Sequence, residues 1–179
     1  MSKYEIKVDG IVETEDLYLI GFERYSNMEK LPELMKADFM KLCEYADKVE
    51  LTGPAIAVYK GFDLETLNTC TLHALQVEPT EESAATCMQV LDDKGMWAVL
   101  PPFPAVLKVT LTGSYDNLKE AWQTAYKFIE ENELIPDTYA SPWEAYKVNP
   151  ADTNGDDSKL VTEIFAPLIP LEDEEEVIE

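Results

Sequence analysis

The chain has only one histidine, His73, and three cysteines, Cys43, Cys70 and Cys87, with no Cys-x-x-Cys pair. A structural zinc site takes four Cys or His ligands, usually in closely spaced pairs, so this composition argues against one. Three unevenly spaced cysteines also do not make the disulfide framework of a small secreted domain. We therefore interpret them as free thiols and predict a cytoplasmic protein without a metal site.

Basic residues are scarce as well. Fourteen lysines and arginines stand against 36 aspartates and glutamates, which gives a net charge of −22. Binding to nucleic acid needs a basic surface, so direct contact with DNA or RNA is not expected. An acidic surface suits the attraction of cations, contact with a basic protein partner, or simple solubility.

Long apolar runs are missing too. None approaches the roughly 20 residues that span a bilayer, and the first residues, 1–5, lack the apolar core of a signal peptide. We expect no membrane association. The hydrophobic fraction of 46% is that of a globular protein, and 179 residues supply material for one or two small domains.

What the chain does contain is a succession of short alternating segments. Strands are predicted near residues 4–13, 17–25, 55–60, 69–78, 96–100, 105–112, 143–148 and 159–167, with a shorter one at 88–91. Helices are predicted after Asn27 and after Ser114, which are both good N-cap residues. Residues 81–86 are interpreted as a polar connector. The mixture indicates an α+β protein.

The two halves of this succession resemble each other. A shift of 87 residues places Asn27 on Ser114, Leu31 on Leu118 and Tyr59 on Tyr146. Self-similarity over this length favours two pseudo-symmetric β-α-β-β repeats rather than a solenoid, whose repeats are shorter. We predict one domain over residues 1–170, with repeats at about 4–80 and 87–168, followed by an acidic tail at 171–179.

Glu144 is the residue in this pattern that most needs an explanation. In a strand over residues 143–148, Glu144, Tyr146 and Val148 share one face, and Lys147 points to the other. Either this is an exposed strand with a solvated Glu144, or the carboxylate points inward, where burial is costly without a partner. The 87-residue shift places Glu144 on Ala57, so the repeat itself does not require an acid. This favours a functional role for Glu144.

Several segments taken together resemble the GyrI-like small-molecule-binding fold of the SOUL/GyrI group, which also forms the effector-binding domain of AraC-type and multidrug-sensing regulators. The resemblance covers residues 4–170. It is carried by Gly53-Pro54 before a strand, by a helix start at Gly113-Ser114-Tyr115, by Glu144-Ala145-Tyr146, and by Thr162-Glu163-Ile164-Phe165-Ala166-Pro167. No basic helical pair precedes Tyr4, so a stand-alone module is expected.

This resemblance implies a concave antiparallel sheet with helices on its outer side and a ligand cleft between the two repeats. In that cleft the glutamate of the Glu-x-Tyr motif, here Glu144, would pair with lipophilic cationic ligands. Two positions depart from the pattern. Ser114 replaces a proline, and Phe103-Pro104 replaces Ala-Gly. The bulk of Phe103 could narrow or close the cleft.

The function expected from these observations is the binding of lipophilic, cationic or aromatic small molecules. The candidate ligand-binding residues are Glu144 and a set of aromatic residues, because aromatic rings and a carboxylate both attract organic cations. These aromatics are Tyr146, Tyr59, Tyr25, Trp97, Tyr115 and Phe165. Trp122 is interpreted as a core residue of its helix.

Two other functions remain open. Some GyrI-like proteins hydrolyse cyclopropane-bearing alkylating compounds, and a buried Glu144 with a raised pKa could act there as a general acid or base. No nucleophile elbow, Cys-His pair or P-loop supports catalysis, so we lean against an enzyme. Other relatives inhibit DNA gyrase, and the acidic surface could contact gyrase or another basic partner. No cofactor is expected, because haem needs an axial ligand and His73 is more simply a core or surface residue.

Overall fold

A computed structural model describes residues 4–171. The acidic tail predicted at 171–179 lies outside the described residues, apart from Leu171. The strands are β1 (Glu5–Val12), β2 (Leu17–Asn27), β3 (Ile56–Asp63), β4 (Asn68–Gln76), β5 (Met96–Leu100), β6 (Val106–Thr112), β7 (Ile135–Pro136), β8 (Trp143–Val148) and β9 (Val161–Ile169). The helices are α1 (Leu31–Ala46), α2 (Glu81–Asp92) and α3 (Leu118–Glu131), with short 3-10 turns η1 (Tyr115–Asn117) and η2 (Asp157–Lys159).

The strands form one antiparallel sheet in the order β1-β6-β9-β8-β3-β4-β2-β5, and β7 pairs with β9 beside it. This order reads as two equivalent halves that meet where β3 pairs with β8. The fold is thus the predicted α+β arrangement of two pseudo-symmetric β-α-β-β units, β2-α1-β3-β4 and β6-α3-β8-β9. Each half has one added edge strand: β1 pairs with β6 of the second half and β5 with β2 of the first.

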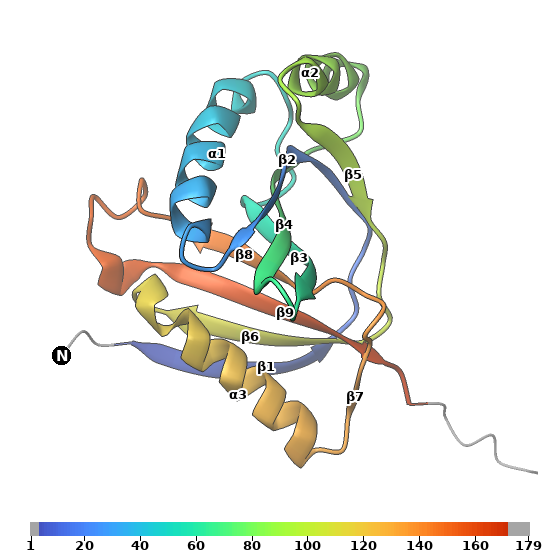
Figure 1. The fold of residues 1–179 in the computed structure, drawn as a ribbon, viewed down its shortest axis with the longest axis vertical. Coiled ribbons are helices and arrows are strands. Elements are labelled where there is room, and N and C mark those ends of the chain that lie inside the picture. Colours follow the sequence, from blue (N-terminus) through green and yellow to red (C-terminus); the bar gives the residue numbers. More distant parts are fainter. Residues whose placement is uncertain (1–3, 172–179) are drawn as a thin grey trace, which may run out of the picture.

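The helices α1 and α3 cover one face of the sheet (Figure 1). Helix α1 packs on β2 and β4, whereas α3 packs on β1, β6 and β9. Leu31 and Leu118, 87 residues apart, begin the two helices. The opposite face is the inner side of the curved sheet, where Leu19, Leu100 and Val106 join one apolar cluster with Trp143.

The predicted capping residues Asn27 and Ser114 lie three residues before the N-caps of α1 and α3, which are Lys30 and Asn117 and make no side-chain capping bond. The side chain of Asn27 accepts a hydrogen bond from the backbone N–H of Lys30 at 3.0 Å, so it closes the turn that precedes α1. Ser114 accepts from the backbone N–H of Asp116 at 3.2 Å and starts η1, which runs directly into α3.

Helix α2 was not predicted, and the expectation of a connector at 81–86 followed by a strand at 88–91 is wrong. Thr80 is its N-cap and accepts a hydrogen bond from the backbone N–H of Ser83 at 3.2 Å. Its buried residues, Ser83, Thr86, Cys87 and Val90, have helical spacing. The apolar period was hidden because two of these positions hold small polar residues.

Among the described residues, no helix is both long enough and apolar enough to cross a membrane.

Candidate functional site

The candidate site lies at the seam between the two halves of the sheet. Glu144 of β8 is directly opposite Ala57 of β3. Opposite residues of an antiparallel pair point to the same face, which here is the face covered by α1 and α3. The small Ala57 leaves room for the longer Glu144 side chain, which is only 1% exposed.

Aromatic side chains hold the Glu144 carboxylate. The indole N–H of Trp122, on α3, donates to Oε1 at 2.6 Å. The Tyr146 hydroxyl, two residues along β8, donates to Oε2 at 2.6 Å. The Tyr59 hydroxyl of β3 also interacts with this carboxylate. Both carboxylate oxygens therefore have aromatic donors, which satisfy their hydrogen-bonding needs but bring no positive charge.

More aromatic rings surround these donors. Tyr115 and Phe39 each meet the Tyr146 ring edge to face, with centroids 5.7 and 5.6 Å apart. Tyr59 meets Trp122 in the same way at 6.0 Å, and Tyr126 stacks on Trp122 at 5.9 Å. The rings come from α1, η1, α3, β3 and β8. We call this group the aromatic cage: Phe39, Tyr59, Tyr115, Trp122, Tyr126 and Tyr146.

Burial dominates the electrostatics of the cage. It raises the pKa of Glu144 above its ordinary value, and the hydrogen bonds from Trp122, Tyr146 and Tyr59 only partly oppose this. Burial, together with the nearby carboxylate, holds the pKa of Tyr59 and of Tyr146 well above the usual range. The same causes raise the pKa of Tyr115 to about 12. The tyrosines are therefore neutral donors at physiological pH.

Glu144 differs from the other buried acids of residues 4–171. These are Asp38 and Glu163, which are 2% and 8% exposed. Asp38 is paired with Arg24 and His73, and Glu163 with Lys108 and Lys147. Within the described part of the chain, Glu144 alone among these acids has no basic partner.

The Asp38 network lies next to the cage on the same face of the sheet. Arg24 Nε donates to Asp38 Oδ2 at 2.9 Å, and His73 Nδ1 donates to the same oxygen at 2.7 Å. Because Nδ1 carries the proton of the neutral ring, Nε2 accepts from the Thr71 hydroxyl, 3.0 Å away. Burial lowers the pKa of His73, against the effect of Asp38. His73 is thus a fully buried core residue of this network.

Four of the sequence-predicted site residues come together: Glu144, Tyr146, Tyr59 and Tyr115. The other three lie elsewhere. Tyr25 is 59% exposed and donates to Asp63 at 2.9 Å. Trp97 on β5 packs near Tyr18, with ring centroids 6.1 Å apart. Phe165 stacks on Trp143 at 4.9 Å on the inner face of the sheet, because its neighbour Ile164 is the residue opposite Glu144.

Sequence reasoning missed three members of the cage, Phe39, Trp122 and Tyr126. Trp122 does pack against the core cluster under α3, as expected, but its N–H donates to Glu144. A tryptophan near a core needs an acceptor for this group, which was the available signal. Phe39 follows Asp38, the one acid in the apolar stripe of α1, and that interruption was also visible.

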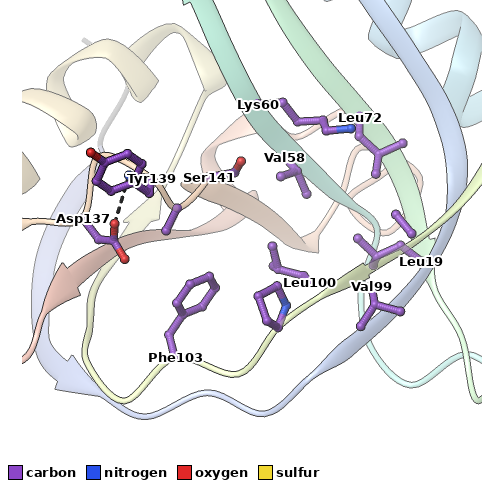
Figure 2. Close-up of a pocket in the computed structure, with 13 residues that line it drawn as sticks. Leu19, Val58, Lys60, Leu72, Val99, Leu100, Phe103, Asp137, Tyr139 and Ser141 are labelled. Atoms are coloured by element: carbon purple, nitrogen blue, oxygen red, sulfur yellow. Dashed lines mark hydrogen bonds between the residues drawn. The ribbon is translucent and has the colours of Figure 1, made fainter.

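The inner face of the sheet carries a separate hollow of about 300 Å³ (Figure 2). Its lining includes Leu19, Val58, Leu72, Leu100 and Phe103. The charged groups at its rim already have partners: Lys60 pairs with Glu23, and Asp137 accepts from the backbone N–H of Tyr139 at 2.9 Å.

A second inner-face hollow, of about 340 Å³, lies beside Trp143, Phe165 and Glu163. Neither of these two hollows includes Glu144. Phe103 belongs to the inner face as well, and its ring centroid is 5.8 Å from that of Trp143. In this structure the Glu144 carboxylate is covered by the rings of the cage, which lies on the other side of the sheet from Phe103.

No protein-family model matches the chain, and no curated protein matches it in sequence. Solved structures are similar in fold. The EcmrR C-terminal domain is 16% identical with a TM-score of 0.69, over 94% of this chain and 99% of that one. The EcmrR chain of a DNA complex gives a TM-score of 0.70, and this chain covers 58% of its length.

Two further structures extend the comparison. SAV2435 bound to tetraphenylphosphonium is 14% identical with a TM-score of 0.61, over 95% of this chain and 96% of that one. A hydrolase encoded by lin2189 from Listeria innocua is 14% identical with a TM-score of 0.55, over 94% of this chain and 92% of that one. The chain therefore shares the fold of these structures, which is the GyrI-like fold that its motifs predict.

Proposed function

We propose that this protein binds lipophilic organic cations in the aromatic cage and that Glu144 is their charge partner. The observation that carries the proposal is the contrast among the buried acids. Asp38 and Glu163 have basic partners, whereas Glu144 has only neutral donors. A buried carboxylate in such surroundings is unfavourable unless a positive charge reaches it.

The cage supplies the second half of the binding chemistry. A cation held over an aromatic face gains roughly 0.5–2 kcal/mol, depending on its desolvation. Tyr59, Tyr115 and Trp122 are half-buried and Tyr126 is 49% exposed. All of these rings are more exposed than Tyr146, which is 7% exposed, so a ligand reaches Glu144 past them when their side chains rotate aside. The tetraphenylphosphonium bound by SAV2435, which shares the fold, is a cation of this class.

The test is a titration of tetraphenylphosphonium followed by tryptophan fluorescence, because Trp122 touches Glu144 directly. We expect saturable binding that Glu144→Gln weakens at least tenfold, or about 1.4 kcal/mol. The matched control is Glu163→Gln, which changes a buried glutamate on the other face of the sheet and is expected to leave binding unchanged. Neutral triphenylphosphine oxide should bind weakly to all three proteins. Equal affinity of wild type and Glu144→Gln would refute the role of Glu144.

A second candidate function is hydrolysis of reactive small molecules of the cyclopropane type. Its support is the raised pKa of Glu144 beside tyrosine hydroxyls, which suits proton transfer to or from water. Two similar structures from Listeria innocua are described as hydrolases. Ring opening of a cyclopropane-bearing alkylating compound, followed by mass spectrometry, tests it. Turnover by wild type and its loss in Glu144→Gln would favour an enzyme over a binding protein.

A further inference from the structure

Thr162 on β9 has a hydroxyl that the fold leaves without a partner. The side chain is 0% exposed, and within residues 4–171 its Oγ1 is the buried side-chain polar atom for which no hydrogen bond is found. A buried hydroxyl that has lost water and gained no partner is costly, and native structures contain few of them.

The other buried hydroxyls in this part of the chain show how unusual this is. Each buried serine or threonine hydroxyl other than that of Thr162 donates to a defined acceptor, either a backbone carbonyl or the His73 ring, and the buried tyrosine hydroxyls donate to carboxylates. The serine and threonine hydroxyls belong to Thr69, Thr71, Ser83, Thr86 and Thr153. Thr162 is therefore the exception among the buried side-chain polar atoms of residues 4–171.

The position of Thr162 links it to the aromatic cage. It is directly opposite Tyr146 in the β8–β9 pair, and Glu144 is opposite Ile164, two residues further along β9. Thr162 thus points to the same face as Glu144 and is its diagonal neighbour, at a distance of about 7–8 Å for such pairs. Tyr115 lies over Tyr146 on this side, so Thr162 borders the cage where η1 leads into α3.

We propose that Thr162 is a ligand-contacting residue that selects cations carrying a hydroxyl or carbonyl oxygen. This rests on the proposed cation site, and it adds a second requirement to the ligand. The cationic centre pairs with Glu144, and an oxygen a few ångströms away accepts from the Thr162 hydroxyl. A purely hydrocarbon cation fulfils only the first requirement.

Two probes of equal charge and nearly equal size separate these contributions. They are (2-hydroxyethyl)triphenylphosphonium and n-propyltriphenylphosphonium, which differ by a hydroxyl in place of a methyl group. Calorimetry measures their affinities for wild type, Thr162→Val and Thr162→Ser. Valine replaces the hydroxyl by a methyl group of similar shape, whereas serine keeps the hydroxyl.

We expect wild type to prefer the hydroxyethyl probe. Thr162→Val should lower the affinity for the hydroxyethyl probe about fivefold and change the affinity for the propyl probe by less than twofold. Thr162→Ser should retain the preference for the hydroxyethyl probe. Because no hydrogen bond is lost, Thr162→Val should also unfold at a higher urea concentration than wild type. Serine leaves the hydroxyl unpartnered and should not produce this gain.

Equal effects of Thr162→Val on both probes, or no effect on either, would overturn the proposal. So would a loss of stability in Thr162→Val, because the hydroxyl would then have a partner in the fold. Glu144→Gln distinguishes a failure of the proposed cation site from a failure of the proposed role of Thr162. If it weakens the propyl probe while Thr162→Val changes nothing, the cation site stands and only the role of Thr162 fails. If neither probe binds to wild type, both proposals fail.

Discussion

Ala57 and Glu144 lie directly opposite each other in the β3–β8 pair, and the 87-residue shift that relates the two halves of the sequence also places one on the other. A pair related in both ways lies at the pseudo-twofold axis of the fold. The axis therefore carries one carboxylate and one methyl group, where strict symmetry would give two identical side chains. A single buried acid at a symmetric seam avoids like-charge repulsion, and the small Ala57 opposite it leaves room for its side chain.

The pH dependence of stability should reveal Glu144. Burial raises its folded-state pKa above the ordinary value of 4.5, so the folded protein keeps a proton that the unfolded chain has already lost. The free energy of unfolding should therefore fall as the pH rises from about 4.5 through the folded-state pKa. Glu144→Gln cannot titrate and should lack this fall. Urea unfolding from pH 4 to 8 measures both proteins, and parallel curves would contradict the assignment.

Trp122→Phe should keep the ring packing but remove the N–H that donates to Glu144 at 2.6 Å. Hydrogen bonds to charged groups contribute roughly 1.5–3 kcal/mol, so we expect weaker binding of tetraphenylphosphonium. This donor lowers the pKa of Glu144, so its loss should move the onset of cation binding to higher pH. Calorimetry at several pH values measures the change. Trp97→Phe on β5 is the control, and an identical shift there would count against the cage.

Asp38→Asn should destabilise the fold, because it leaves the Arg24 guanidinium and the buried His73 ring without their carboxylate. Loss of one partner from a buried pair costs about 3–5 kcal/mol. Arg24 is 39% exposed, which reduces this to roughly 2 kcal/mol. Glu23→Gln breaks the exposed pair with Lys60 and should cost less than about 1 kcal/mol. Chemical unfolding of both variants measures which of them loses more stability.

Gly21→Ala should disrupt the β2–β4 pairing. A Cβ at this position would lie 2.0 Å from the His73 carbonyl oxygen and 2.8 Å from Ala74 Cα, and neither backbone atom can yield cheaply. We expect a loss of roughly 3 kcal/mol or more, as for other overpacked sites. At Gly61 the same methyl group would meet nothing within 4 Å, so Gly61→Ala should be neutral or slightly stabilising. Similar thermal midpoints for the two variants would contradict this account.

Local pattern was enough to predict much of this fold. Alternation located eight of the nine strands of residues 4–171, missed the two-residue β7 and wrongly placed a strand at 88–91. The 87-residue shift matched the starts of α1 and α3 and related Ala57 to Glu144. Capping and apolar spacing depend on residues only a few positions apart, so they can be recognised in a single sequence. Helix α2 was not predicted because the polar residues Ser83 and Thr86 occupy its buried face.

The candidate site depended on strand pairing, which a single sequence does not encode locally. Alternation placed Glu144 and Tyr146 on one face, and the pairing of β3 with β8 brings Tyr59 to them. Phe165 falls on the opposite face because the β8–β9 register places Ile164 opposite Glu144. Trp122 reaches the carboxylate from a helix that the strand pattern could not position.

Proton release on ligand binding tests the role of Glu144 most directly. A cation that pairs with Glu144 favours the ionised carboxylate, so binding should expel the proton that burial retains. Titration calorimetry with tetraphenylphosphonium in buffers of different ionisation enthalpy measures this between pH 4.5 and 8. We predict that wild type releases a fraction of a proton over part of this range and that Glu144→Gln releases none. Binding to wild type without proton release at any of these pH values, or equal release by Glu144→Gln, would contradict the account.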